Sequence, residues 1–357
     1  MENKPKPVVI VCPLNWGIGH ATRCVPIVRQ LIAHGYQPVL ASSGQALELL
    51  KRTFAELPHE ELPDYQIKYQ KKGSFSLKIA KLIPSILKAI KKERQATEDL
   101  VKKYAAVGVI SDNRFGCRSK EVPSVFITHQ IRVLSPVGQR LLRALNKKHI
   151  AKFDACWIPD FEGDKSLTGK LSKPYKSIKK VEYLGALSRL QPKTLNANEG
   201  FQYLALLSGP EPQRTMLEEI LKVELKAYSG KSVLIRGVFD GECRVEVDGQ
   251  MTIKDHALNA ELEQLISDCK VVICRSGYST MMDLCQWGKR AIMIPTPGQT
   301  EQEFLSERMD KKSYVPNISQ TTFKLADAAQ KLSLYTGLPK MESASVNWER
   351  LFKPFAG

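Results

Sequence analysis

The fold is decided by the stretch Val271-Val-Ile-Cys-Arg-Ser-Gly-Tyr-Ser-Thr-Met-Met-Asp-Leu284 and its continuation Ile294-Pro-Thr-Pro-Gly-Gln-Thr-Glu-Gln-Glu-Phe304. The apolar run 271–274 is typical of a buried strand, and the small residues at 275–280 open a helical pattern. A second apolar run, 291–294, leads through a Pro/Gly turn into a helix that begins Glu-Gln-Glu. This alternation of strand and helix predicts a parallel sheet covered by helices.

The same alternation extends over the rest of the chain. Strands are expected at 7–12, 37–42, 65–69, 107–111, 124–128, 155–158, 202–207 and 232–236, and helices at 21–34, 44–54, 76–104, 138–152, 215–227, 259–267, 279–287, 301–311 and 322–334. A length of 357 residues suits two domains. The class is therefore α/β with two Rossmann-like domains, residues 1–190 and 201–340. The turn-rich segment 191–200 is the expected linker, and the tail 341–357 is expected to pack back on the first domain.

Composition excludes several classes of protein. The chain is 43% hydrophobic and 25% charged, as expected for a globular protein. The apolar run 8–12 is too short for a signal peptide, and no stretch approaches the roughly 20 apolar residues of a membrane span. The eight cysteines form no CxxC pair, so we expect reduced thiols in a cytoplasmic protein without a metal site.

The excess of positive charge is confined to the first half of the chain. Residues 1–200 carry 34 Lys and Arg against 17 Asp and Glu, whereas residues 201–357 carry 19 against 20. The excess favours an anionic partner, which could be nucleic acid, anionic lipid or a phosphorylated acceptor, but it also suits a surface selected for solubility. Residues 76–92 read as a basic amphipathic helix that either lies on an anionic membrane or packs on the domain.

The loop after the first strand reads Gly17-Ile-Gly19-His20. It matches neither GxGxxG nor a P-loop, but Gly17 and Gly19 allow the backbone to approach a ligand. His20 then stands at a helix N-terminus, where it is either a general base or a residue of the turn. Asp112 and His129 each follow a predicted strand. Asp112 could orient His20, bind a substrate or cap a helix, and His129 is either functional or a core histidine.

The second domain carries the features of a sugar-nucleotide site. Ser208 and Gly209 lie between its first strand and helix, where backbone N–H groups can meet a diphosphate, although the loop could be an ordinary Pro-rich turn. The turn 276–280, including Ser276, Gly277, Ser279 and Thr280, has the same placement after a later strand. Asp283 could accept hydrogen bonds from a ribose, and Gln302 and Glu303 could bind a hexose.

These residues carry a resemblance to the glycosyltransferase family 28 group (MurG-like), which has the GT-B fold. The likeness extends over about residues 200–310 and includes the first-domain loop 17–20 and the segment Thr128-His129-Gln130. It implies Asp283 on the ribose, where the family has Glu, and Gln302 and Glu303 on the donor sugar, where the family commonly has Gln-Gln. It also implies Ser208, Gly209 and Arg275 at the diphosphate.

The expected function is that of an inverting, metal-independent glycosyltransferase with no cofactor. It would move a hexose or N-acetylhexosamine from a UDP-sugar to a glycan or lipid-linked acceptor bound by the first domain, at the inner face of the membrane. A sugar-nucleotide epimerase on the same fold is the first alternative. A basic nucleic-acid-binding protein is the second, and the few aromatic residues within 71–152 argue against it.

Overall fold

The computed structural model describes residues 5–64, 75–136, 138–192, 200–238, 242–340 and 346–356, with the backbone alone over 75–83. The chain divides into two compact units. Unit 1 consists of Met1–Leu187 and Ala344–Gly357, and unit 2 consists of Ser188–Ser343. Within the described part, no helix is long and apolar enough to cross a membrane.

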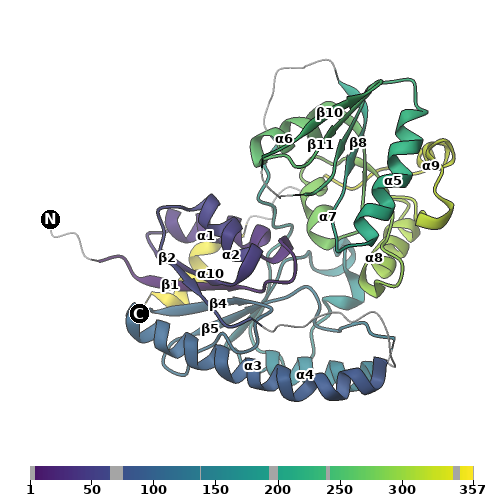
Figure 1. The fold of residues 1–357 in the computed structure, drawn as a ribbon. Helices are drawn as coiled ribbons and strands as arrows, with labels where there is room; N and C mark the ends of the chain where they lie inside the picture. Colours follow the sequence, from purple (N-terminus) through teal and green to yellow (C-terminus); the bar gives the residue numbers. More distant parts are fainter. Residues whose placement is uncertain are drawn as a thin grey trace. The chain divides into compact units, whose positions relative to one another are not determined.

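Unit 1 is built on a parallel sheet of seven strands among the described residues, in the order β3-β2-β1-β4-β5-β6-β7 (Figure 1). The strands are β1 (Val8–Pro13), β2 (Gln37–Ser42), β3 (His59–Glu61), β4 (Gly108–Asp112), β5 (Ser124–Ile127), β6 (Ala155–Ile158) and β7 (Val181–Tyr183). The helices are α1 (Gly19–Ala33), α2 (Gly44–Thr53), α3 (Phe75–Lys103), α4 (Gln139–Ile150) and α10 (Trp348–Phe352), with short 3-10 turns at Gly163–Lys165, Gly169–Leu171 and Lys353–Phe355.

Both faces of this sheet are buried because alternate side chains of each strand point to opposite sides. Val9 and Val11 of β1 belong to the apolar cluster made with α1, α2 and α10. Ile10 and Cys12 belong to a second cluster, which includes Leu100 of α3. Figure 1 shows α1, α2 and α10 on one face and α3 and α4 on the other. Strands buried on both faces explain the uninterrupted apolar runs in the sequence.

The C-terminal segment completes the core of unit 1. The rings of Phe352 and Phe355 lie 6.1 and 6.5 Å, centre to centre, from Trp157 of β6. Tyr36 donates a hydrogen bond of 3.2 Å to the carbonyl of Phe352. At the start of β4, Gly108 leaves room for Phe355, since a Cβ there would overlap the phenyl ring.

Unit 2 contains a sheet of six strands in the order β10-β11-β9-β8-β12-β13, counted over its described residues. The strands are β8 (Phe201–Leu206), β9 (Ser232–Ile235), β10 (Val245–Asp248), β11 (Met251–Lys254), β12 (Cys269–Cys274) and β13 (Arg290–Met293). The helices are α5 (Gln213–Lys226), α6 (Asn259–Asp268), α7 (Tyr278–Cys285), α8 (Thr300–Lys311) and α9 (Leu325–Leu332), with a 3-10 turn at Gln320–Thr322. All strand pairs are parallel except β10 with β11.

The α/β class with parallel sheets is confirmed, and the differences lie at the edges of the sheets. The expected strand 65–69 falls outside the described residues, as does most of the linker, 193–199. The antiparallel hairpin β10–β11 and the short strands β3 and β7 were not expected. Pro84 lies inside α3, which runs through it as one helix.

Candidate active site

The three catalytic candidates of unit 1 come together at one edge of its sheet. Because β1, β4 and β5 are parallel neighbours, their carboxyl ends lie side by side. Gly17 adopts a left-handed φ of +72° in the loop after β1, and α1 begins two residues later. His20 is therefore in the first turn of α1, close to Asp112 at the end of β4 and His129 after β5.

A fourth residue, Arg23, joins these three. His20 Nδ1 lies 2.9 Å from Asp112 Oδ1 and 2.7 Å from Arg23 Nη2. Arg23 Nε donates to Asp112 Oδ2 at 2.5 Å, Arg23 Nη2 donates to Asp112 Oδ1, and Arg23 Nη1 lies 2.9 Å from His129 Nδ1. The four side chains thus form one hydrogen-bonded cluster, called here the His20 cluster.

Exposure separates the members of the His20 cluster. Asp112, Arg23 and His129 are 0%, 3% and 6% exposed, whereas the side chain of His20 is 15% exposed. His20 is therefore the member that a ligand at this edge can reach, with the other three behind it.

The charges of the cluster set its protonation. Burial alone would raise the pKa of Asp112, but the Arg23 charge, His20 and their hydrogen bonds outweigh it and hold that pKa well below its usual range. The pKa of His20 is lowered, first by burial and then by the Arg23 charge, against the opposing effect of Asp112. Asp112 is thus a carboxylate and His20 a neutral imidazole at neutral pH.

A second buried ion pair holds the turn that follows Asp112. Arg114 Nε donates to Glu93 Oε1 of α3 at 2.8 Å, and both side chains are fully buried. Glu93 Oε2 accepts from the backbone N–H of Gly116 at 3.0 Å, and Ser111 Oγ donates to the Arg114 carbonyl at 2.6 Å. This arrangement fixes the backbone on both sides of Asp112.

In unit 2, the expected donor-site residues gather at the carboxyl ends of β8, β12 and β13. Ser208 and Gly209 are exposed after β8, and Gly209 has a left-handed φ of +104°. Gly277, Ser279 and Thr280 are half-buried around the start of α7. Ser276 is buried, and its Oγ donates to the Gln302 carbonyl at 2.8 Å, which ties the β12 turn to α8.

Arg275 does not reach the surface, contrary to the expectation of a direct diphosphate contact. It is 1% exposed and donates to the backbone carbonyls of Gln213, Ile294 and Pro295 at 2.7, 3.2 and 3.3 Å. Burial lowers its pKa to about 10, so it stays a cation at neutral pH. The guanidinium holds the loops around the ends of β12 and β13 in place from beneath.

Asp283, Gln302 and Glu303 are all half-buried and all engaged within unit 2. Asp283 accepts a 2.5 Å hydrogen bond from Ser188 Oγ, and burial raises its pKa to about 6. Gln302 Oε1 accepts from the Thr296 N–H at 2.9 Å, and Glu303 Oε1 accepts from the Gly298 N–H at 2.8 Å. The Gln302 and Glu303 side chains therefore hold the 296–299 turn.

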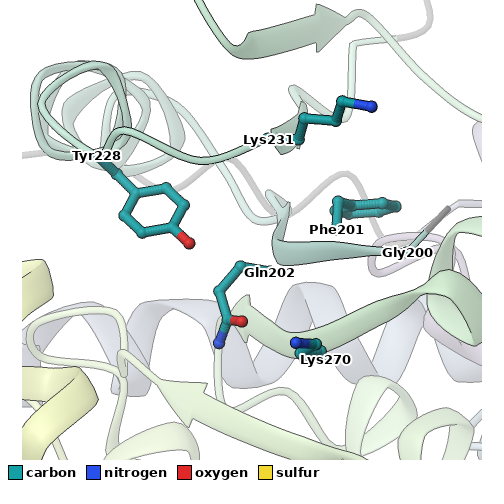
Figure 2. A pocket seen from close by; sticks show the side chains of 6 residues that line it. All are labelled: Gly200, Phe201, Gln202, Tyr228, Lys231 and Lys270. Atoms are coloured by element: carbon teal, nitrogen blue, oxygen red, sulfur yellow. The ribbon is translucent and has the colours of Figure 1, made fainter.

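A separate hollow of about 490 Å³ lies at the opposite, amino end of the unit 2 sheet (Figure 2). It is lined by Gly200, Phe201, Gln202, Tyr228, Lys231 and Lys270. These residues lie at or beside the starts of β8, β9 and β12, so the hollow is distinct from the expected donor edge. Among the described residues, no cluster of His, Cys, Asp and Glu is placed to hold a metal ion.

Comparison with known proteins gives consistent results. Residues 239–344 match the model of the glycosyltransferase family 28 C-terminal domain. An uncharacterized glycosyltransferase of Methanopyrus kandleri is 23% identical over 327 residues, covering 85% of this chain and 90% of that protein. MurG of Acinetobacter baumannii has a TM-score of 0.57 at 15% identity, covering 93% of each chain. A UDP-glucosyltransferase from Polygonum tinctorium has a TM-score of 0.61 at 11% identity, covering 99% of each chain.

The two Rossmann-like units and these likenesses define the class: the protein is a glycosyltransferase with the GT-B fold. The match to the family 28 C-terminal domain over residues 239–344 includes the stretch 271–304, on which the resemblance was based.

Proposed function

We propose that the protein transfers a hexose or N-acetylhexosamine from a UDP-sugar to an acceptor hydroxyl with inversion. The observation that carries this proposal is the His20 cluster, in which a neutral and partly open histidine is backed by a buried carboxylate. The acceptor hydroxyl gives its proton to His20 Nε2 while its oxygen attacks the anomeric carbon. The bond from that carbon to the diphosphate breaks, and UDP leaves.

Unit 2 binds the donor in this proposal. The N-terminal ends of α5 and α7 offer backbone N–H groups and positive dipole ends to the diphosphate. Ser208, Gly209 and the turn 276–280 contact the diphosphate. Asp283 accepts hydrogen bonds from the ribose, either beside the bond that it accepts from Ser188 or in place of that bond. The diphosphate charge is met by these groups without a metal ion, so we expect a chelator to leave the rate unchanged.

Unit 1 binds the acceptor, and its basic surface supports an anionic or lipid-linked one. Lys88, Lys91 and Lys92 are exposed on α3 beside the exposed Leu87. Cations next to an exposed leucine suit peripheral contact with an anionic bilayer surface. For residues 76–83 of the segment, including Lys81, only the backbone is described.

Nucleotide binding and product analysis test the proposal together. Calorimetry should show that UDP binds more tightly than TDP or GDP. Asp283→Ala should weaken the binding free energy of UDP by about 1.5–3 kcal/mol, the range for losing a charged hydrogen-bond acceptor. Glu246→Ala, at an exposed carboxylate of β10, is the control and should leave UDP affinity unchanged. Equal UDP affinity in the Asp283 variant would contradict the ribose assignment.

Product analysis distinguishes transfer from epimerisation. Labelled UDP-sugar incubated with a lipid extract should yield a β-linked product from an α-linked donor. Formation of an epimeric sugar nucleotide without any acceptor would instead show an epimerase.

A further inference from the structure

Arg23 contacts the proposed base His20, the buried carboxylate Asp112 and the neighbouring His129. It meets both oxygens of Asp112, and it also lies 2.7 Å from His20 Nδ1 and 2.9 Å from His129 Nδ1. It is 3% exposed, so it has little access to a substrate. Any effect of Arg23 on the reaction therefore passes through its three neighbours.

The contacts determine which ring nitrogens carry protons. A guanidinium has only donors, so His129 Nδ1 must accept from Arg23 and the proton of the neutral ring lies on Nε2. His20 Nδ1 has two partners that favour opposite tautomers, because Asp112 Oδ1 can only accept from it and Arg23 Nη2 can only donate to it. The base proposed above needs its lone pair on Nε2, and this requires that His20 Nδ1 donates to Asp112 while Arg23 Nη2 donates to Asp112 Oδ1. In that state the two rings present opposite functions, an acceptor from His20 and a donor from His129.

The same contacts set the charge of the cluster. Arg23 neutralises Asp112 through paired hydrogen bonds, the geometry in which Arg and carboxylate interact most strongly. The groups that act on His20 are Arg23 from α1, Asp112 from β4 and His129 from the loop after β5. Asp112 favours an imidazolium at position 20, but burial and the Arg23 charge outweigh it.

We propose that Arg23 is a positioning residue that keeps His20 uncharged as the base and fixes His129 as a hydrogen-bond donor. The part of this inference that concerns the reaction rests on the proposed function. The part that concerns protonation does not, because it can be measured without any substrate.

Histidine titration by NMR on the full chain tests the protonation directly. In Arg23→Gln, Asp112 keeps its charge and loses its cation, so His20 should become its imidazolium partner and titrate about one pH unit or more higher than in the wild type. Arg29→Gln, a loss of charge at an exposed position of α1, is the control and should leave both histidines unchanged. An unchanged His20 titration in Arg23→Gln would overturn the proposal.

A second pair of variants covers the case in which Arg23→Gln fails to fold because Asp112 is left buried and unpaired. Asp112→Asn leaves the Arg23 cation beside His20 and should lower further the pH at which His20 titrates. Adding Arg23→Gln to Asp112→Asn should raise that pH again, toward the ordinary value for histidine. Equal His20 titrations in Asp112→Asn and the double variant would contradict a role of the Arg23 charge.

The tautomers and the reaction have their own readouts. Imidazole ¹⁵N shifts should place the neutral proton on Nδ1 of His20 and Nε2 of His129, and the opposite assignment would overturn the tautomer argument. In the transfer assay, the acid limb of kcat/KM should move to higher pH in Arg23→Gln by the same amount as the NMR titration. A moved titration with an unmoved acid limb would support the role of Arg23 in protonation and count against His20 as the base.

Discussion

His149 is a buried histidine outside the proposed site, and its burial changes how readily the folded protein binds a proton there. It is 9% exposed near the end of α4, and its ring centre lies 5.0 Å from that of Phe115. Burial lowers its pKa to about 4, and the nearby charges of Lys152, Lys148 and Arg118 act in the same direction. The folded protein therefore holds His149 neutral at a pH where the unfolded chain protonates it.

This difference predicts acid destabilisation that begins below the ordinary histidine pKa. Because the unfolded state binds the proton more readily, His149 should reduce the free energy of unfolding by about 2–3 kcal/mol between pH 7 and pH 4.5. His149→Gln should remove that part of the loss, as measured by urea unfolding at the two pH values. His34→Gln, at the exposed residue that follows α1, is the control. Equal losses in His149→Gln and the wild type would contradict the prediction.

The meeting of His20, Asp112 and His129 at one edge of the sheet could be predicted from the sequence, because each follows a strand and the carboxyl ends of parallel strands share that edge. Arg23 could not, since a lone arginine is ordinarily assigned to a solvated helix face. The available signal was its position, three residues after His20 within the apolar run of α1. Its pairing with Asp112 spans 89 residues and depends on the strand order, which the sequence does not state.

At the level of elements, α3 reaches the site through one buried ion pair. Glu93 is fully buried on a helix whose neighbouring positions Lys91 and Lys92 are exposed, and it binds both Arg114 and the Gly116 N–H. At Gly116 a Cβ would overlap Glu93, so the turn and the helix pack backbone to side chain. The helix thereby supports the turn after Asp112.

Breaking this pair should destabilise unit 1 strongly. Glu93→Gln leaves Arg114 buried without its counter-charge and should cost about 3–5 kcal/mol of unfolding free energy. Arg94→Gln, next in the helix, removes only a partly exposed pair with Glu98 and should cost about 0.5 kcal/mol. Denaturant unfolding of both variants measures the difference. A similar small loss in both would show that the buried pair does not hold the turn.

The strands that the sequence did not predict are short and lie near sheet edges. β3, β7 and the β10–β11 hairpin have three or four residues per strand. β10 is exposed over Val245, Glu246 and Val247, so it shows no alternation of buried and exposed residues. Long, doubly buried strands such as β1 and β12 carry a clear apolar run, and those were predicted.

Over the molecule as a whole, charge divides with the two units. Residues 1–200 carry 34 basic against 17 acidic side chains, and residues 201–357 carry 19 against 20. The division at Leu187 and Ser188 thus separates a basic unit from a nearly neutral one. If the acceptor is lipid-linked, this asymmetry presents unit 1 to an anionic bilayer.

Sedimentation with vesicles tests whether the basic unit binds an anionic membrane. The protein should bind anionic vesicles at low ionic strength and bind neutral ones little, because each lysine near anionic headgroups contributes about 1 kcal/mol. Lys81, Lys88 and Lys91 changed together to Gln should weaken the binding. The same change at Lys231, Lys270 and Lys311 of unit 2 is the control of equal charge. Equal recovery with anionic and neutral lipid would contradict membrane contact.

The assignment of catalysis to unit 1 and donor binding to unit 2 is tested most directly by His20→Ala. Turnover and UDP affinity are measured on the same preparation, beside the wild type and His129→Ala. Loss of a general base should lower kcat by a factor of about 10² to 10⁴ and leave the Kd for UDP unchanged. A nearly normal kcat in His20→Ala, with transfer abolished in His129→Ala, would contradict the assignment and move the base to His129.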